Sequence, residues 1–347
     1  MPETMNRDPK GILKKGWSST VEDYAIAGEW ASGGDVFVVG DAAGGVFGLG
    51  GKSGDKLWAK PDAHPDGLLC MAVSPKGRIV ATGGQDGRVV LSDVMSGEAI
   101  AELDVAKTWV EHLAWSSDAQ CLAVAGGRRV YVYDADSKLA WSTDDHPSTV
   151  SAIIWSGSNE LATACYGRVT FFDAKTQEVR QKLEWKGSLV SMVLSPDGDI
   201  VACGSQDNSV HFWRRSSGQD SMMSGYRAKP SALTFDAAGK LLATGGGDTV
   251  TVWSFEGDGP EGTTPGILEL HVENITSLTF AGKGRRLASG SRDGSVIVWD
   301  LAQDGSGSPV GAAVLDDIVA SLSWRPDGRS LVALDAKGGV TAMRVRG

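Results

Sequence analysis

Apolar and polar residues alternate loosely along this chain in short stretches, and turn residues separate one stretch from the next. The clearest set has three stretches, Ile275–Phe280, Arg286–Ser291 and Ser295–Asp300, with Gly-Lys-Gly and Arg-Asp-Gly turns between them. A weaker fourth stretch follows at Val310–Leu315. A period near two over such short lengths is typical of β-strands and not of helices. The pattern therefore predicts an all-β protein.

The same order of stretches and turns recurs eight times. A bulky residue ends the third stretch of each unit except the second, where Ser92 stands. These positions are Leu49, Ser92, Tyr133, Phe172, Trp213, Trp253, Trp299 and Met343. Their mean spacing of about 42 residues matches the length of one β-propeller blade. Because a sheet of so few short strands cannot bury its own faces, the units must stack on one another.

The repeats predict one β-propeller domain over residues 1–347, most simply with eight four-stranded blades. Seven blades with one degenerate unit is the alternative. The last unit ends after its third stretch, Val340–Arg346, and so lacks an outer strand. Gly11–Ser18 precedes the first unit and has no other partner, so we expect it to close the ring as that strand. The Gly- and Pro-rich segment 256–266 is expected to be a flexible inserted loop.

The repeat unit resembles the WD40 repeat. The residues that carry the resemblance are dipeptides at the end of the third stretch, aspartate-containing turns, and a histidine before the first stretch. They are Trp299-Asp300, Tyr133-Asp134, Phe172-Asp173 and Ser92-Asp93; Gln85-Asp86-Gly87, Gln206-Asp207-Asn208, Gly247-Asp248-Thr249 and Arg292-Asp293-Gly294; and His64, His146 and His271. The chain is thus identified as a WD40-repeat protein over essentially its whole length.

The resemblance implies a structural tetrad in unit seven, formed by His271, Ser289, Asp293 and Trp299. Such a buried hydrogen-bond relay would tie a loop to the strands of the blade. Unit six retains Thr244, Asp248 and Trp253 but has no histidine, and unit three has neither the histidine nor the aspartate. Apolar packing is expected to hold those units.

Charge and composition narrow the class of function. The formal net charge is −10, which argues against a nucleic-acid partner because such binding depends on neutralised phosphates. No stretch is apolar enough to predict a membrane span or a signal peptide. The four cysteines, none in a Cys-x-x-Cys pair, are expected to be reduced thiols of a cytoplasmic protein.

The sequence contains no set of residues with the types and spacing that a known catalytic or metal site requires. Gly45–Ser53 ends like a phosphate-binding loop, but Val46 stands where that motif needs its first glycine. The five histidines are far apart in sequence, so no local metal pair exists and no cofactor is predicted. Gly45–Trp58 also looks like the tryptophan-docking repeat of eight-bladed quinoproteins, echoed at Val130–Trp141. The prediction is a protein that is not an enzyme.

A partner is expected to bind the propeller face that carries the loop into the first strand and the turn between the second and third strands. On that face the candidate residues are Tyr24, Ile26, Leu69, Trp109, Tyr166 and Arg292. Aromatic residues and arginine commonly anchor interfaces. The alternative for Ile26, Leu69 and Val190 is packing between blades near the pore.

The sequence therefore predicts a scaffold or adaptor that docks a protein or peptide, without nucleic acid or membrane. Two alternatives stay open. One is a propeller enzyme or quinoprotein-like ligand-binding protein with a central-channel site, for which the first-strand starts offer Glu111 and Lys229. The other is a structural subunit of a larger complex.

Overall fold

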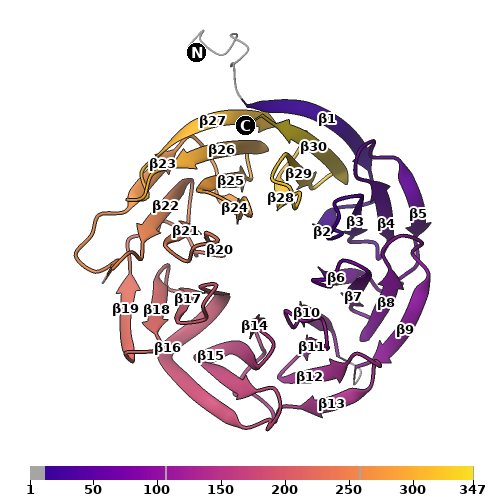
Figure 1. The fold of residues 1–347 in the computed structure, drawn as a ribbon, viewed down its shortest axis with the longest axis horizontal. Coiled ribbons are helices and arrows are strands. Elements are labelled where there is room, and N and C mark those ends of the chain that lie inside the picture. The colour runs from indigo at the N-terminus through magenta and orange to yellow at the C-terminus, as the bar shows by residue number, and fades with distance from the viewer. Residues whose placement is uncertain (1–11, 106–107, 258, 347) are drawn as a thin grey trace.

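The computed structural model describes residues 12–105, 108–257 and 259–346. In these ranges every regular element is a β-strand, and the strands radiate in layers around a common centre (Figure 1). The chain runs once around the ring, so each sequence repeat follows its predecessor in space. This is an all-β, single β-propeller.

Each repeat contributes strands in the order inner, second, third, outer. The inner strands are β2 (Ala25–Trp30), β6 (Leu68–Val73), β10 (Val110–Trp115), β14 (Ala152–Ser156), β20 (Ala232–Phe235), β24 (Ile275–Phe280) and β28 (Val319–Trp324). The second strands are β3 (Val36–Asp41), β7 (Ile79–Gly84), β11 (Cys121–Gly126), β17 (Ile200–Ser205), β21 (Leu241–Gly245), β25 (Arg286–Ser291) and β29 (Ser330–Asp335).

The third and outer strands complete the repeats. The third strands are β4 (Val46–Gly50), β8 (Arg88–Asp93), β12 (Arg129–Asp134), β18 (Val210–Arg214), β22 (Thr249–Ser254), β26 (Ser295–Leu301) and β30 (Gly339–Val345). The outer strands are β5 (Lys56–Lys60), β9 (Ala99–Asp104), β13 (Leu139–Ser142), β19 (Gln219–Met223), β23 (Gly266–Glu269), β27 (Gly307–Val314) and β1 (Leu13–Thr20). Two longer strands, β15 (Glu160–Asp173) and β16 (Val179–Leu194), serve units four and five.

Hydrogen bonding joins these strands into seven sheets, where the sequence predicted eight separate four-stranded blades. Six sheets have four strands, and the seventh has the order β14-β15-β16-β17-β18-β19. The difference arises because β16 pairs with β15 through its first half and with β17 through its second half. The ends of β15 lie side by side, since the Ala174 N–H donates to the Asn159 carbonyl at 2.8 Å. Units four and five therefore share one strand instead of being separated by a loop.

The N-terminal strand β1 belongs to the sheet of the last unit. It pairs antiparallel with β30, from Leu13 opposite Val345 to Thr20 opposite Gly339. The sequence placed this strand at residues 11–18; Gly11 lies outside the described residues, and the observed strand extends to Thr20. In Figure 1, β1 lies along the outer side of β30. The edge of β30 is thus covered by a segment from the opposite end of the chain.

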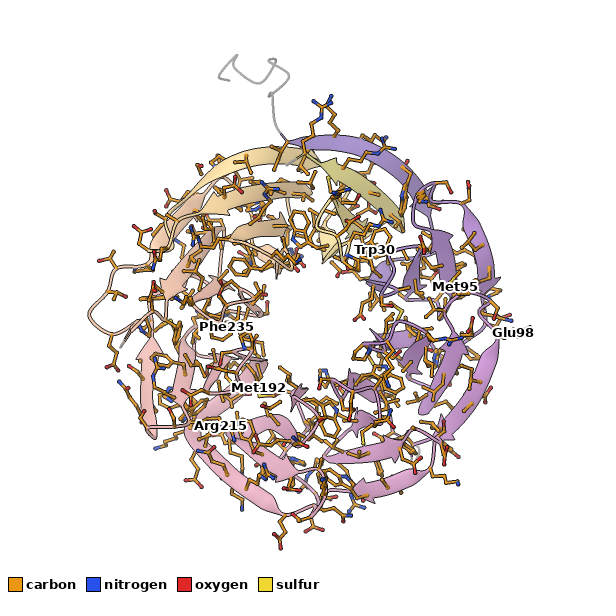
Figure 2. The ribbon with its side chains drawn as sticks, in the orientation of Figure 1. Trp30, Met95, Glu98, Met192, Arg215 and Phe235 are labelled. Carbon is orange, nitrogen blue, oxygen red and sulfur yellow. The ribbon has the colours of Figure 1, made fainter. Side chains whose placement is uncertain are left out.

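The hydrophobic core consists of packing layers between neighbouring units. The space between units six and seven, for example, holds Val250, Leu268, Ile275 and Trp299. One such layer joins the last unit to the first, with Trp30 and Phe37 beside Leu334 and Val340. Side chains fill the space between the sheets throughout the ring (Figure 2). Each unit is stabilised chiefly by its neighbours, as expected of a repeat architecture.

The described part of segment 256–266 connects β22 to β23 within unit six and contacts residues of units five and six. The Gly259 carbonyl accepts a hydrogen bond from Arg214 Nη2 at 3.2 Å, and Glu261 accepts one from Gln219 Nε2 at 2.8 Å. Glu256 pairs with Lys240 at 2.9 Å. Asp258 lies outside the described residues. Over the described ranges, no helix has the length and apolar character needed to cross a lipid bilayer.

Candidate functional site: one face of the propeller

A recurring backbone hydrogen bond brings the two predicted loop families onto one face. In unit one the Ala42 N–H, in the turn between the second and third strands, donates to the Tyr24 carbonyl at 2.9 Å. Arg292 and Asn274 make the same contact in unit seven at 3.0 Å. The equivalent pairs elsewhere are Gln85 with Gly67, Gln206 with Ser188, and Ala336 with Ile318. The turn and the loop into the inner strand are therefore adjacent, and we call this surface the turn face.

Six inner strands carry a β-bulge at the same repeat position. The register shifts place the extra residue at Ile26, Leu69, Glu111, Val190, Thr276 and Ala320. A bulge leaves one residue without a ladder partner and changes the direction of its side chain. These positions adjoin the turn face at the start of the strands that surround the centre (Figure 1). Ile26 and Leu69, two predicted site residues, are thus bulge residues.

The three aromatic residues predicted for the site are all exposed. The exposed fractions are 37% for Tyr24, 55% for Trp109 and 56% for Tyr166. Among the described residues, the large apolar side chains that are exposed include three aromatic ones, and these are the three. They belong to units one, three and four, and unit two lies between the first two of these. The three side chains therefore lie on the turn face within one half of the ring, and we call them the aromatic arc.

Ile26 and Leu69 are half-buried, and in the described part of the chain neither is a member of the hydrophobic clusters between units. Arg292 is exposed on the turn face, but it belongs to unit seven. Unit eight lies between it and unit one. The arc formed by Tyr24, Trp109 and Tyr166 consequently excludes Arg292. The predicted set thus divides into an aromatic arc and one remote arginine.

The structural tetrad of unit seven is present, with one additional member. His271 Nε2 and Trp299 Nε1 both bond the Ser289 hydroxyl, at 2.7 and 2.8 Å. On the other side His271 Nδ1 meets Ser295 Oγ at 2.5 Å, and Ser295 donates to Asp293 at 2.5 Å. His271 Nδ1 is 3.9 Å from the Asp293 carboxylate, so Ser295 bridges the pair. Sequence reasoning missed Ser295.

Electrostatics within the tetrad favours a neutral histidine beside a charged aspartate. Burial lowers the pKa of His271, although the Asp293 carboxylate opposes this shift. Burial also raises the pKa of Asp293, but hydrogen bonds from Ser295 and from the Val272 N–H outweigh it, and the net pKa is lowered. Neutral imidazole can donate at one nitrogen and accept at the other. The relay therefore needs no buried positive charge.

Units two and four keep the histidine part of this arrangement. His64 bonds Thr82 Oγ1 at 2.9 Å and Asp86 at 3.1 Å. His146 bonds Thr163 Oγ1 at 2.9 Å, and its other ring nitrogen is 3.1 Å from the Arg128 carbonyl. Burial lowers the pKa of both histidines. Three of the five histidines are thus satisfied as structural groups.

Unit six replaces the missing histidine by a tyrosine that sequence reasoning did not identify. Tyr226 Oη bonds Thr244 Oγ1 at 2.8 Å and accepts from Trp253 Nε1 at 3.1 Å. Tyr226 precedes Thr244 by 18 residues, the separation found for His271 and Ser289. This 18-residue spacing is the sequence signal by which Tyr226 could have been predicted. Unit six, for which apolar packing was expected to be the main stabilising contact, thus also contains a hydrogen-bonded group.

Unit five places an aromatic stack at the same position. The rings of Trp185 and His211 are stacked with centroids 3.8 Å apart, and Trp213 meets His211 edge-on at 4.3 Å. His211 is buried, which lowers its pKa, and its Nε2 is 3.3 Å from the Asp220 carboxylate. In place of a hydroxyl, this unit has Cys203, which is fully buried. Unit five is thus held by ring contacts.

The residues considered for metal or channel chemistry lie apart from one another in the described part of the chain. No group of three or more His, Cys, Asp or Glu side chains within these ranges is placed to hold a metal ion. Glu111 is half-buried in unit three and Lys229 is exposed in unit six, with two units between them. Burial raises the pKa of the Cys165 thiol, which makes it a poor nucleophile.

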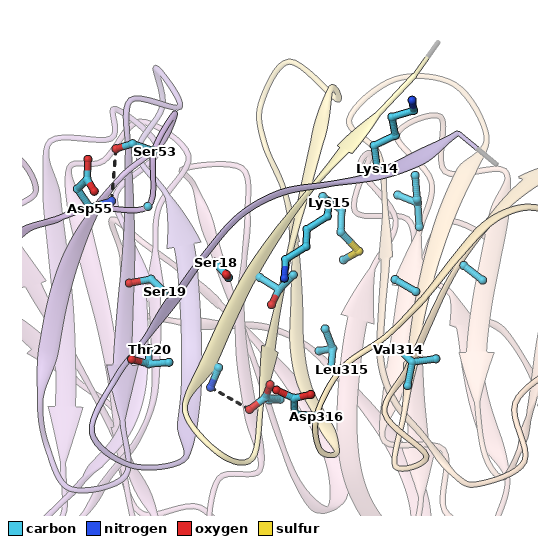
Figure 3. Close-up of a pocket in the computed structure, with 18 of the residues that line it drawn as sticks. Lys14, Lys15, Ser18, Ser19, Thr20, Ser53, Asp55, Val314, Leu315 and Asp316 are labelled. Atoms are coloured by element: carbon cyan, nitrogen blue, oxygen red, sulfur yellow. Dashed lines mark hydrogen bonds between the residues drawn. The ribbon is translucent and has the colours of Figure 1, made fainter. Parts of the chain in front are cut away.

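A groove lies on the outer side of the last unit (Figure 3). It has a volume of about 740 Å³ and lies between β1, β27 and β30. Lys14 and Lys15 from β1 and Asp55 and Asp316 from neighbouring turns are among its lining residues. None of the predicted partner-binding residues lines this groove, so it is separate from the aromatic arc.

Family profiles match the chain in three segments. The profile of the WD domain, G-beta repeat, matches residues 178–214 and 262–300, and the second of these segments contains the complete tetrad. The profile of the anaphase-promoting complex subunit 4 WD40 domain matches residues 29–118. The chain is a WD40-repeat protein.

Curated relatives of this WD40 protein differ in their printed roles. It is 26% identical over 248 residues to periodic tryptophan protein 2 of Arabidopsis thaliana, covering 70% of this chain and 23% of that one. It is 27% identical to cell division cycle 20.1, cofactor of APC complex, of the same plant, with 53% and 42% covered. A probable cytosolic iron-sulfur protein assembly protein 1 of Mycosarcoma maydis is 29% identical, with 61% and 39% covered. The WD40 protein thus spans less than half the length of each.

Solved structures agree with the fold. The computationally designed Ika8 protein superposes with a TM-score of 0.82 at 23% identity, covering 96% of this WD40 protein and 100% of the design. The RRP9 WD40 repeats give a TM-score of 0.64 at 15% identity, with 80% and 94% covered. At such identities the likeness concerns the fold alone.

Proposed function

We propose that this WD40 protein is a non-catalytic, cytoplasmic scaffold that docks a protein or peptide on the turn face. The observation that supports the proposal is the aromatic arc of Tyr24, Trp109 and Tyr166. An exposed aromatic ring costs free energy in water, and it has a large area to bury against a partner. Large aromatic side chains are the residues that most often anchor protein interfaces.

The rigidity of the propeller also favours a docking role. Tyr24 lies in a loop held by the recurring backbone hydrogen bond, since its carbonyl accepts from the Ala42 N–H. Tyr166 is fixed further by its N–H, which donates to Ser148 Oγ at 2.8 Å. A surface held in one conformation loses little entropy when a partner binds. Ile26 and Leu69 add aliphatic area at the inner side of the arc.

The remaining parts of the proposal rest on composition and on the relatives. The net charge of −10 disfavours a polyanionic partner. All four cysteines are free thiols, which suits a reducing compartment. The printed names of relatives include a cofactor of the APC complex and APC/C activator protein CDH1 of Saccharomyces cerevisiae. Those names describe proteins that act on a larger protein assembly.

The test compares partner recovery by three forms of the full chain. The first is wild type, the second carries Trp109→Ala and Tyr166→Ala, and the third carries Leu139→Ala and Ile267→Ala. Leu139 and Ile267 are matched controls because they are 55% and 51% exposed but lie on outer strands. Each form is used as bait in lysate after circular dichroism shows that it is folded.

We expect proteins recovered by wild type and by the control to be lost with the arc variant. Binding of one such purified protein should weaken at least tenfold, the usual size of an anchor-residue effect. Unchanged recovery and affinity with the arc variant would refute docking at this arc. Conversion of many substrate molecules by each molecule of the purified chain would refute the proposal that the protein is not catalytic.

We also propose that the ring acts as eight blades and that β1 closes it. The two halves of the six-stranded sheet pack against each other through a layer that includes Phe171 and Trp213, as neighbouring units do elsewhere in the ring. The pairing of β1 with β30 protects an edge that would otherwise be open to other strands. Deletion of residues 1–20 should lower the melting temperature and promote association on size-exclusion chromatography. An unaltered, monodisperse variant would argue against closure.

A further inference from the structure

Unit two carries the histidine part of the tetrad but has no aromatic ring to complete it. His64 bonds Thr82 and Asp86 directly, whereas His271 bonds Ser289 and reaches Asp293 through Ser295. Where unit seven has Trp299, however, unit two has Ser92. The smaller side chain leaves unfilled the space that the indole occupies in unit seven.

A cavity of about 360 Å³ is found at this place, between units one and two. Val46 and Trp58 line it from unit one, and Thr82, Val90 and Ser92 line it from unit two. Its volume lies in the range of small-molecule pockets, about 300–1,000 Å³. The N–H of Trp58 is directed away from Thr82, since Nε1 donates to the Val94 carbonyl at 2.9 Å. Trp58 is therefore a wall of the cavity, and its N–H does not replace the N–H of the missing ring.

Unit seven shows which chemical group suits such a space. There the indole of Trp299 packs against Val250 and Leu268 of the preceding unit, and it is 2% exposed. Its Nε1 donates to the Ser289 hydroxyl at 2.8 Å. Val250 and Ser289 hold the repeat positions of Val46 and Thr82. The cavity of unit two thus shares these two positions with unit seven. Its outer-strand wall differs, because Lys60 stands opposite Val46 where Leu268 stands opposite Val250, and Trp58 stands where unit six has Gly266.

The hydrogen-bonding state of Thr82 leaves an acceptor for a donor inside the cavity. Burial lowers the pKa of His64, so the imidazole is neutral near pH 7. Its Nδ1–H donates to the Asp86 carboxylate, and its Nε2 then accepts the Thr82 hydroxyl hydrogen at 2.9 Å. The Thr82 oxygen, which also lies 3.3 Å from the Val90 carbonyl, keeps lone pairs. The corresponding lone pairs of Ser289 receive the indole N–H of Trp299 in unit seven. Apolar walls with one such acceptor are complementary to an indole.

We propose that the cavity between units one and two binds an indole ring, with the ring N–H donating to Thr82 Oγ1. The ring is either a free small molecule or the tryptophan side chain of a bound peptide. Lys60, Asp62, Arg88 and Glu102 also line the cavity and supply polar groups of both signs around the apolar walls. This site is independent of the aromatic arc, because it uses none of the arc residues.

The test measures binding of 5-fluoroindole to the full chain by ¹⁹F NMR. Wild type should bind with a dissociation constant near 1 mM or tighter, as expected for so small a ligand. Ser92→Trp should abolish binding because its own ring fills the cavity. Ser92→Ala, which keeps the cavity open, should bind as wild type does. Circular dichroism and thermal melting establish that each variant is folded.

The role of the N–H is tested with 1-methylindole, which has the same ring but no donor. Wild type should prefer indole by about fivefold, the effect of one net hydrogen bond. In Thr82→Val the preference should disappear, while binding of 1-methylindole persists. No binding by wild type, or equal binding by folded Ser92→Trp and wild type, would overturn the proposal. If wild type bound indole and 1-methylindole with equal affinity, Thr82 Oγ1 would not be the acceptor of the ring N–H.

A third comparison separates the two sources of the ring. Free indole is compared with a blocked pentapeptide that has a central tryptophan in alanine. Tighter binding of the peptide, lost in Ser92→Trp, would assign the cavity to a tryptophan side chain of a partner. Binding of free indole alone would assign it to a small molecule. The variant Trp109→Ala, Tyr166→Ala should leave both affinities unchanged, which keeps this test distinct from that of the docking face.

Discussion

The indole Nε1 of Trp30 donates a hydrogen bond to the carbonyl of Ser323, 3.3 Å away and 293 positions later in the chain. The same bond joins inner strands elsewhere in the ring, from Trp155 to the Ala114 carbonyl at 3.0 Å and from Trp324 to the Thr279 carbonyl at 3.1 Å. In each case the tryptophan ends an inner strand and its partner belongs to the preceding unit. The junction between the last and first repeats thus uses the contact that joins sequential neighbours.

Replacing Trp30 by phenylalanine should lower the free energy of unfolding by about 1–2 kcal/mol, because a hydrogen bond and part of a buried ring are lost. Trp155→Phe, at a junction between sequential units, is the matched comparison. Denaturant unfolding of both variants measures the effect. If Trp155→Phe is destabilising and Trp30→Phe is not, the junction between the chain ends contributes nothing to stability.

Ser289→Ala should destabilise the protein by about 2–4 kcal/mol. The substitution removes a hydroxyl that bonds both His271 and Trp299, and it leaves two buried polar groups unsatisfied. Ser289→Thr should retain nearly full stability, because Thr82 and Thr244 perform the same role in other units. Thermal melting compares the three proteins. Equal melting temperatures for Ser289→Ala and wild type would show that the relay is energetically neutral.

Tyr226→Phe should cost about 1–2 kcal/mol, since Thr244 and Trp253 both lose their bond to the tyrosine hydroxyl. Tyr226→His should recover part of that loss, because units two, four and seven place a histidine at this position. Urea unfolding distinguishes the two variants. A Tyr226→His protein less stable than Tyr226→Phe would contradict the equivalence of the two residues.

Stability should fall as the pH decreases below about 6.5. In the unfolded chain histidine takes up a proton near that pH, whereas burial lowers the pKa of His64, His146 and His271 in the folded protein. Between the folded and unfolded pKa values the unfolded state binds more protons, so stability rises with pH.

His271→Tyr removes one titrating group and keeps a hydroxyl at the tetrad position. The slope of unfolding free energy against pH, measured from pH 7 to pH 5, should decrease by up to about 1.4 kcal/mol per pH unit. Tyr226→His should steepen the same slope, which provides the converse control. An identical slope in wild type and His271→Tyr would mean that His271 does not titrate differently on folding.

The tetrad illustrates how far sequence reasoning reached. Its four members in unit seven follow from a motif with fixed spacing, and all four lie in one hydrogen-bonded relay. Ser295 was missed because it is an ordinary strand residue, and only side-chain geometry places its hydroxyl between His271 and Asp293. Tyr226 was missed because the motif specifies residue type, while the structure requires a hydrogen-bonding group at a given place.

The aromatic arc shows what the sequence could and could not predict about the surface of the ring. Repeat alignment predicted which positions share a face, since equivalent residues of a repeat occupy equivalent sites. The exposure of Tyr24, Trp109 and Tyr166, and the separation of Arg292 from them, depend on the order of units around the ring. The cavity beside Ser92 likewise depends on packing between neighbouring units, even though Ser92 stood out in the sequence as the exceptional residue.

By itself, the sequence determined the architecture, because strand alternation, turn residues and a repeat of about 42 residues are local properties that every unit expresses independently. It also determined the members of the unit-seven tetrad, through a spacing that the strand register preserves. Only the tertiary structure decided how β16 joins units four and five, how Trp30 reaches Ser323, and which space Ser92 leaves empty. Those features arise between units, where residues far apart in the chain meet and no local pattern records the contact.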